Sequence, residues 1–201
     1  MLCLSKQELL DQLVQDNHGV LRTSDVVDAD ISRTYLASYV KNRGMERVAH
    51  GIYLAANAWC DGFYLLQARW PKAIFSHEAG LYLWKVAERE PMPMTVTLPA
   101  GCNVSNLSDD GIKVYKIKAE LYDLGKTETL SPNGHKVYTY NPERCLCDLL
   151  RSRSQVEVQD ITSAMREYVW QKDKNIPLLL RYAKEFRVER ILKPYLEVLL
   201  P

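Results

Sequence analysis

The first 54 residues carry a close succession of helix start and stop signals, and this succession restricts the possible folds more than any other feature. Ser5 and Glu8 form an S-x-x-E capping box. Apolar residues then recur at helical spacing as far as Val14. Asn17-His18-Gly19 follows, and glycine readily adopts the left-handed conformation that ends a helix. These signals predict a first helix that ends near residue 17.

Two more helices are predicted directly after the first. Thr23 is expected to cap a short helix, and residues 28–30 then form a tight turn. Either Asp30 or Ser32 caps a third helix that runs to about Arg43, where Gly44 ends it. The side chains of this third helix that are expected to face the core are Leu36, Tyr39 and Val40. Tyr35 either joins this core, which we favour, or donates a hydrogen bond to a DNA phosphate.

A hairpin is predicted after the third helix. The runs 45–48 and 52–54 have the composition of short strands, and Ala49-His50-Gly51 joins them as a glycine-containing loop. The order helix, short helix, turn, helix and hairpin is typical of a winged helix-turn-helix.

Charge is distributed unevenly over this segment. Residues 8–30 contain six acids and one base, a net charge of −5, whereas residues 33–47 contain four bases and one acid, a net charge of +3. The basic charge therefore lies on the third helix and the hairpin, where a winged helix meets DNA phosphates. A solvated basic face or a protein-interaction module are the alternatives. The agreement of element order and local charge favours binding of double-stranded DNA.

Individual residues receive roles from this interpretation. Arg33 and Thr34 stand at the start of the third helix, where side chains reach base edges, and Arg33 has the geometry for a bidentate contact to guanine. Small side chains further along the helix permit close approach to the groove, and basic ones near its end and on the hairpin are expected to contact phosphates. His50 is either a DNA contact or a plain turn residue. The candidate DNA-binding residues are Ser32, Arg33, Thr34, Ala37, Ser38, Lys41, Arg43, Arg47 and His50.

The remainder of the chain predicts a second domain of α+β class with a helical C-terminal half. We expect residues 1–57 to form the winged helix and residues 58–201 to form this second domain. Strands are expected at 95–98, 111–118 and 136–140. Helices are expected at 76–86, from Asn141-Pro142-Glu143 onward, and near 157–170, 177–186 and 188–199.

No catalytic or metal-binding motif is recognisable in the sequence. The five cysteines, Cys3, Cys60, Cys102, Cys145 and Cys147, have neither disulfide nor zinc spacing, so we interpret them as reduced, buried thiols. His77 and Glu78 are adjacent and point apart on a helix, and Arg144 and Asp148 have the spacing of a surface ion pair. We therefore expect no enzyme activity, no cofactor and no metal site.

Seven basic residues outside the winged helix define a possible second basic surface, which would extend a DNA footprint or meet a partner. The alternative is a set of solubilising lysines that protect an exposed strand edge. These residues are Arg69, Lys72, Lys85, Arg89, Lys113, Lys116 and Lys118. The formal net charge of +1 does not itself indicate a polyanionic partner, so a DNA-binding protein of this composition must concentrate its basic residues locally. The absence of a secretory segment and of a membrane-length apolar run predicts a cytoplasmic protein that does not bind membranes.

Six stretches carry a resemblance to a known family: GVLRTSD (19–25), ISRTYL (31–36), GMERVAHGIY (44–53), SHEAGLYLW (76–84), TVTLP (95–99) and NPERCLCDLL (141–150). In this order they resemble the AbiEi antitoxins of the bacterial AbiE toxin–antitoxin systems, which are called type IV and act in abortive infection and phage resistance. The resemblance spans nearly the whole chain.

The resemblance implies two activities. The N-terminal domain would repress its own operon by binding inverted repeats in the promoter, and cooperative binding by two copies is expected because one small winged helix binds modestly. The C-terminal domain would counteract a nucleotidyltransferase-like toxin without forming a stable complex with it. The alternatives are a transcriptional regulator with a ligand-sensing or dimerising C-terminal domain, and an enzyme with an appended winged helix.

Overall fold

The structure, a computed structural model, describes residues 5–103, 107 and 110–200. These residues form two compact units. The N-terminal unit comprises the described residues up to Trp70 together with Leu130–Val137, and the C-terminal unit comprises Pro71–Thr129 and the residues from Tyr138 onward. The N-terminal unit thus extends beyond the expected boundary at residue 57 and takes in a later segment of the chain. The predicted α+β class is confirmed.

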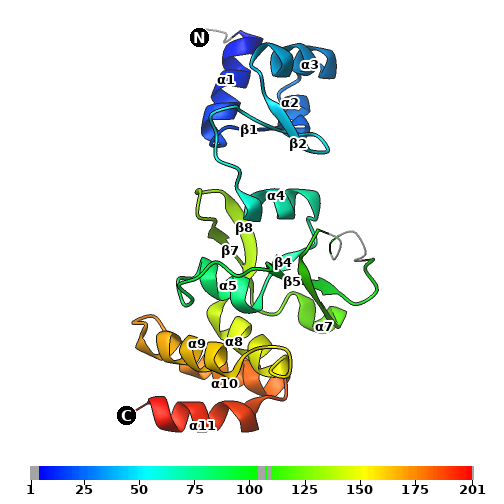
Figure 1. Ribbon diagram of the computed structural model, residues 1–201. Helices are drawn as coiled ribbons and strands as arrows, with labels where there is room; N and C mark the ends of the chain where they lie inside the picture. The colour runs from blue at the N-terminus through cyan, green and yellow to red at the C-terminus, as the bar shows by residue number, and fades with distance from the viewer. Residues whose placement is uncertain (1–4, 104–106, 108–109, 201) are drawn as a thin grey trace. The chain divides into compact units, whose positions relative to one another are not determined.

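The N-terminal unit begins with the winged helix that the sequence predicts (Figure 1). Its elements are α1 (Lys6–Asp16), β1 (Val20–Arg22), α2 (Thr23–Asp28), α3 (Arg33–Asn42), β2 (Glu46–Ala49) and β3 (Ile52–Leu54). The three strands form an antiparallel sheet in the order β1-β3-β2, with Leu54 opposite both Val20 and Glu46. Strand β1 was not predicted, because three residues between two helix signals carry too little pattern. Helix α4 (Gly62–Arg69) belongs to the same unit.

The helix caps follow the predictions with one exception. Ser5 Oγ accepts a hydrogen bond from Glu8 N at 3.2 Å, and Ser5 N donates to Glu8 Oε2 at 2.7 Å, so the capping box is confirmed. Of the two candidate caps for α3, the structure uses Ser32. The prediction for Thr23 was wrong: it is the first residue of α2, and its N–H donates to Gly51 O at 2.8 Å, so the sheet holds this helix start.

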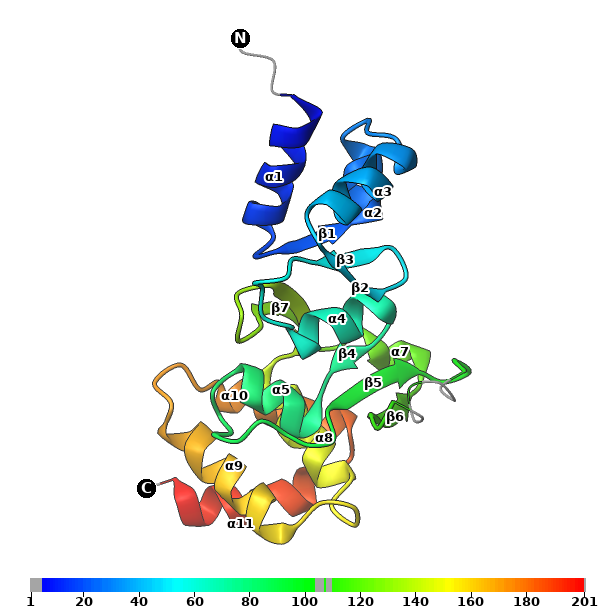
Figure 2. The same cartoon turned by 45° about the horizontal axis from the view of Figure 1, so that its top comes forward.

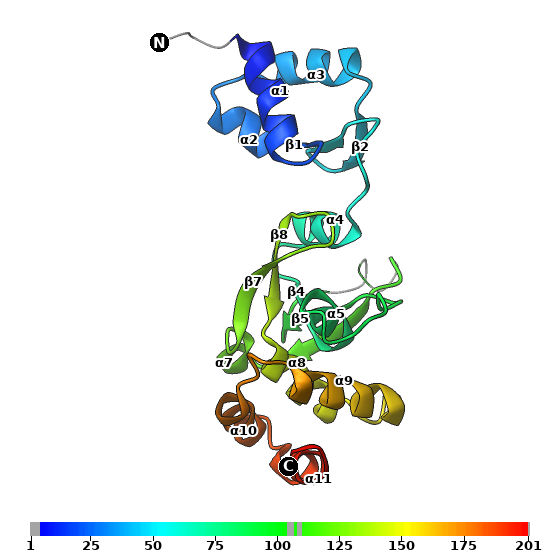
Figure 3. The same cartoon turned by 90° about the vertical axis from the view of Figure 1, so that its left-hand side faces the viewer.

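The core of the winged helix is entirely apolar in composition, and α1, α2 and α3 surround it (Figure 3). Leu36 and Tyr39 are buried in it and Val40 is half-buried, as predicted. Of the two interpretations of Tyr35, the place in the core was wrong, because Tyr35 is 36% exposed. One position on a helix corresponds to a rotation of about 100°, which carries Tyr35 off the face that Leu36 occupies.

The C-terminal unit combines a mixed sheet with a layer of helices. Its elements are β4 (Ile74–Phe75), α5 (His77–Leu83), β5 (Thr95–Pro99), β6 (Lys113–Ile117), α7 (Ala119–Tyr122), β7 (Lys126–Leu130), β8 (Lys136–Tyr140), α8 (Pro142–Arg151), α9 (Val158–Trp170), α10 (Ile176–Glu185) and α11 (Glu189–Leu199). Leu130 at the end of β7 and Lys136–Val137 at the start of β8 belong to the N-terminal unit. The strand order is β6-β5-β4-β8-β7. Strands β5 and β6 are parallel neighbours, β4 is antiparallel to β5, and β4 is parallel to β8 (Figure 2).

Helix α8 is the central element of the helical layer. The predicted start is confirmed, since Asn141 Oδ1 accepts from Arg144 N at 3.0 Å and Pro142 occupies the first turn. Gly80 lets α5 approach α8, because a Cβ at this position would collide with Cys145 Sγ. Buried Leu146 and Leu150 join the large core shared with α9, α10 and α11.

The cysteines only partly match the expectation of buried thiols. All four described cysteines are free; Cys145 and Cys147 are buried, but Cys60 is exposed and Cys102 is half-buried. Cys3 lies outside the described residues. Among the described residues, none of the helices combines the length and the apolar character needed to span a bilayer.

Candidate functional site

The start of α3 is fixed by its N-cap. Ser32 adopts extended backbone angles, and its Oγ accepts a hydrogen bond from Tyr35 N at 3.3 Å. This bond satisfies one of the free N–H groups at the start of the helix. Arg33 is therefore the first helical residue, and its side chain is exposed.

The exposed face of α3 collects most of the candidate DNA-binding residues. Leu36 and Tyr39 bury the opposite face, so helical spacing turns the other side chains toward solvent. The residues brought together on this face are Arg33, Thr34, Ala37, Ser38 and Lys41. Two long basic side chains thus flank two short ones on a surface with no bulky apolar residue between them.

The hairpin of β2 and β3 supplies two more candidates. Arg47 is exposed on β2, and its Nε donates to Ala49 O at 3.4 Å across an irregularity in the strand pairing. His50 is exposed in the turn, where Gly51 adopts a φ of +71°. The turn requires this glycine, because a positive φ strains other residues. Both side chains are accessible to a partner.

Arg43 is engaged differently from the other candidates. Its Nη2 donates to both carboxylate oxygens of Asp11 on α1, at 2.7 and 2.5 Å, and the same carboxylate accepts from Tyr39 OH at 2.6 Å. Burial, followed by the hydrogen bond to Asp11, raises the pKa of Tyr39 to about 12. The group expected to contact phosphate is therefore occupied by a carboxylate that ties α1 to α3.

The residues of the possible second basic surface are dispersed. Arg69 lies on α4 in the N-terminal unit, whereas the other six belong to the C-terminal unit. On β6, Lys113 and Lys116 point to opposite faces because strand side chains alternate. Lys113 is half-buried, and its Nζ donates to Gln155 O at 3.2 Å. Lys72, Lys85, Arg89, Lys116 and Lys118 are exposed.

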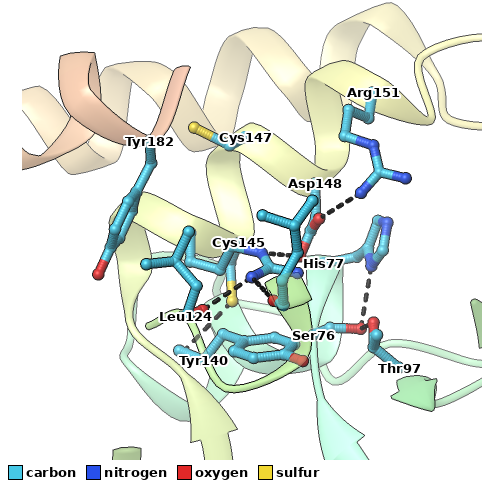
Figure 4. A network of polar contacts seen from close by, with 12 residues as sticks. Ser76, His77, Thr97, Leu124, Tyr140, Cys145, Cys147, Asp148, Arg151 and Tyr182 are labelled. Carbon is cyan, nitrogen blue, oxygen red and sulfur yellow. Dashed lines mark hydrogen bonds and ion pairs between the residues drawn. The ribbon is translucent and has the colours of Figure 1, made fainter. Parts of the chain in front are cut away.

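A buried polar network in the C-terminal unit surrounds His77 (Figure 4). The ring Nδ1 lies 3.0 Å from Ser76 Oγ, which accepts from Thr97 Oγ1 at 2.8 Å, and Nε2 lies 3.1 Å from Ser152 Oγ. The imidazole also stacks on Tyr115 with 3.6 Å between ring centroids. His77 has a φ of +51°, so its backbone is held in a conformation that costs free energy for a non-glycine residue.

The chemistry of this network is that of a neutral imidazole. Burial, together with the charges of Arg151, Lys113 and Arg144, lowers the pKa of His77 well below its usual value. The ring therefore exchanges hydrogen bonds with hydroxyl groups and does not pair with Glu78, in agreement with the expectation that the two side chains point apart. Its side chain is 2% exposed, which leaves little surface for a substrate.

The Arg144–Asp148 pair is buried, and the prediction of a surface ion pair was wrong. Arg144 Nε donates to Asp148 Oδ2 at 2.9 Å, and both side chains are at most 3% exposed. Arg144 Nη1 donates to Leu121 O and Leu124 O, and the guanidinium lies between the rings of Tyr140 and Phe186.

Helical spacing predicts that the side chains of Arg144 and Asp148 meet, but it does not predict whether the face of α8 that carries them is buried or exposed. Burial raises the pKa of the Asp148 carboxyl, and the Arg144 guanidinium opposes this shift. Asp148 also accepts from Arg151 Nη1 at 3.4 Å, as Figure 4 shows.

Within the part of the chain that the structure describes, no group of three or more His, Cys, Asp or Glu side chains has the geometry to hold a metal ion. The groups that sequence reasoning missed are the ones paired over long separations, such as Asp11 with Arg43 and Asp61 with His135. A single acidic residue such as Asp11 or Asp61 has no sequence pattern that indicates a partner so far away in the chain.

The comparisons with known proteins extend the description of the fold. No protein-family model matches the sequence, and no curated protein matches it. Among solved structures, the chain is similar to the RV2827C protein of Mycobacterium tuberculosis, with a TM-score of 0.54, 15% sequence identity and coverage of 88% of this chain and 70% of that chain. At this identity the likeness concerns the fold, and it supports the α+β architecture.

Proposed function

We propose that this protein binds double-stranded DNA through α3 and the β2–β3 hairpin and represses its own operon. The observation that carries the proposal is the exposed face of α3, where Arg33, Thr34, Ala37, Ser38 and Lys41 lie together on a helix of suitable position in a winged helix. The adjoining hairpin adds exposed basic side chains.

The candidate residues of α3 and the hairpin are proposed to form two groups, one that contacts bases and one that contacts phosphates. In this proposal Arg33 and Thr34, which lie exposed in the first turn of α3, contact base edges in the major groove, whereas the exposed Lys41 and Arg47 contact phosphates. Ala37 and Ser38 have short side chains, so the middle of α3 can approach the floor of the groove closely. Specificity in this arrangement depends on the first turn, and affinity depends on the later basic residues.

Two copies on an inverted repeat fit this proposal best. A single small winged helix buries little DNA surface and binds modestly, so two half-sites bound together give the affinity that a repressor needs. We expect cooperative binding to a promoter with two half-sites. A titration that gives simple one-to-one binding to a single half-site would contradict this part of the proposal.

The resemblance to AbiEi antitoxins supports a second role. We propose that the C-terminal unit counteracts a co-encoded nucleotidyltransferase-like toxin, without requiring a stable complex with it. His77 is enclosed and neutral, which favours a non-enzymatic mode of action. The two roles divide between the two units, since the DNA-binding candidates on α3 and the hairpin all belong to the N-terminal unit.

Two experiments test the two roles separately. In a gel-shift titration, the full chain is expected to retard a duplex that contains the DNA upstream of its reading frame and to bind a shuffled duplex of the same composition more weakly. Equal affinity for both duplexes would contradict specific repression. Co-expression of the full chain with the product of a neighbouring nucleotidyltransferase-like gene is expected to restore growth, and a persistent growth arrest would contradict the antitoxin role.

A further inference from the structure

The N-terminal unit contains one segment from much later in the sequence. The chain leaves this unit after Trp70 and returns to it for Leu130–Val137. The returning segment holds Ser131 and His135, and both side chains are buried. A buried histidine and a buried serine in a short connecting segment require partners, because an unpaired polar group in a protein interior is costly.

The partner of both residues is Asp61, the N-cap of α4. His135 Nδ1 lies 2.7 Å from Asp61 Oδ2, and Ser131 Oγ donates to the same oxygen at 2.5 Å. The other carboxylate oxygen accepts from Tyr64 N at 3.2 Å and so caps the helix. The side chains of Asp61 and His135 are 2% and 4% exposed.

The second ring nitrogen of His135 reaches the winged helix. Nε2 lies 3.1 Å from the carbonyl oxygen of Asn17, the C-cap of α1, at a separation of 118 positions in the sequence. The ring also stacks on Tyr64 and meets the ring of His18 edge-on. Tyr64 OH in turn accepts a hydrogen bond from Arg22 Nε at the end of β1. His135 is therefore packed against the junction between α1 and β1.

Helix α1 carries this connection onward to α3. Asp11 accepts hydrogen bonds from Tyr39 on α3 and from Arg43 at the C-cap of α3, and buried Leu10 shares the apolar core with Leu36 of α3. Helix α1 is thus held at its C-terminal end by His135 and along its side by α3, the helix proposed to enter the DNA groove.

We propose that His135 is a positioning residue for DNA binding, which holds the C-terminal end of α1 and thereby sets the orientation of α3. This inference rests on the proposed function. Removal of His135 takes one hydrogen-bond partner from the buried Asp61 carboxylate, which keeps Ser131 Oγ and Tyr64 N, and it also takes the partner of the Asn17 carbonyl, so the segment 130–137 and the end of α1 loosen together. The winged helix reaches its DNA-binding geometry only with a side chain supplied from outside its own 54 residues.

The test uses the full chain and a fluorescein-labelled duplex that contains the DNA upstream of the reading frame. His135→Ala is expected to weaken binding about tenfold, within the range typical of coupling between sites. Since His135 reaches no phosphate, the slope of log affinity against log salt concentration should not change. Lys136→Ala is the matched control, because it removes an exposed side chain from the next position and is expected to bind like the wild type.

A role in stability alone predicts a different result. In that case His135→Ala lowers the unfolding temperature but binds the duplex with wild-type affinity wherever it is fully folded, and this result would overturn the proposal. If His135→Ala does not fold, Ser131→Ala replaces it, since it removes only one hydrogen bond to Asp61. This milder variant is expected to weaken binding by about twofold to fivefold, the size of effect that the loss of one ordinary hydrogen bond produces.

A double-mutant cycle and hydrogen exchange complete the test. The effects of His135→Ala and Asp11→Asn on DNA affinity are expected to be non-additive, because both substitutions act on α1, whereas independent effects would overturn the proposed connection.

If the wild type does not bind the duplex, the proposed function fails, and amide hydrogen exchange then tests whether His135 positions α1 and α3. Faster exchange in both α1 and α3 of His135→Ala supports it, and faster exchange confined to residues 130–137 overturns it.

Discussion

The winged helix and the C-terminal unit differ in what they bury. From residue 5 to residue 54 every buried side chain is apolar or aromatic, and the charged residues all lie at or near the surface. The C-terminal unit instead buries His77, Glu143, Arg144 and Asp148, among others. The first region thus keeps the polar side chains on the exposed face of α3 and on the hairpin accessible to a partner, whereas the second uses buried polar groups to hold its own interior together.

This difference affects how each region should respond to substitution. A polar group on the surface of the winged helix can be removed with little effect on folding, so a loss there reports on binding. A buried charged group in the C-terminal unit leaves its partner unpaired when it is removed, so a loss there reports on stability.

The largest effect is expected for the Arg144–Asp148 pair. Asp148→Ala leaves the Arg144 guanidinium buried without its carboxylate and should lower the free energy of unfolding by about 3–5 kcal/mol. Urea denaturation followed by circular dichroism measures this change. Lys193→Ala is the matched control, because it breaks an exposed pair with Glu189 at the same spacing and should cost about 0–1 kcal/mol. Equal effects of the two substitutions would contradict the contrast.

The next effect is expected on DNA binding. Arg33→Ala should weaken binding to the upstream duplex by about 1–3 kcal/mol and reduce the preference over a shuffled duplex. Because Arg33 is exposed, the unfolding temperature should not change. Fluorescence anisotropy measures the affinity. A variant that binds both duplexes as the wild type does would show that α3 does not read bases.

A similar size is expected for the response of stability to acid. The pKa of His77 is lowered in the folded chain from a usual value of 6.5, so the unfolded chain takes up a proton first as the pH falls. Wild-type stability should therefore decrease as the pH falls below about 6.5, the usual pKa of the imidazole in the unfolded chain. His77→Gln should lose less over the same interval. Parallel pH profiles of the two proteins would argue against a buried neutral imidazole.

A smaller effect is expected for Lys41→Ala. This substitution should weaken binding to all duplexes by a similar factor and reduce the salt slope by about one, since one phosphate contact is lost. Arg43→Ala provides a comparison, because Asp11 already occupies its guanidinium, and its salt slope should stay close to that of the wild type. A larger change of slope for Arg43 than for Lys41 would reverse these assignments.

The smallest effect is expected from the helix caps. Ser32→Ala and Asn141→Ala each remove one capping hydrogen bond and should lower the free energy of unfolding by about 1 kcal/mol. Only Ser32→Ala should also weaken DNA binding, because only α3 faces the proposed partner. A loss of DNA binding in Asn141→Ala without unfolding would show that the two regions are less separate than proposed.

The contrast also explains what sequence reasoning predicted and what it missed. The capping signals at Ser5, Ser32 and Asn141 are local, and the structure uses all three. The burial of Arg144 was missed, because the same spacing occurs on exposed and buried helix faces. The partners of Asp11 and Asp61 were missed, because a hydrogen bond over tens of positions leaves no periodic trace.

Backbone amide NMR of the full chain, with and without the upstream duplex, determines whether α3 and the hairpin contact DNA. On addition of the duplex, the amide signals of residues 32–41 and 46–51 are expected to shift, and those of helices α9, α10 and α11 are not. Shifts confined to the C-terminal unit, with α3 unchanged, would contradict this contact.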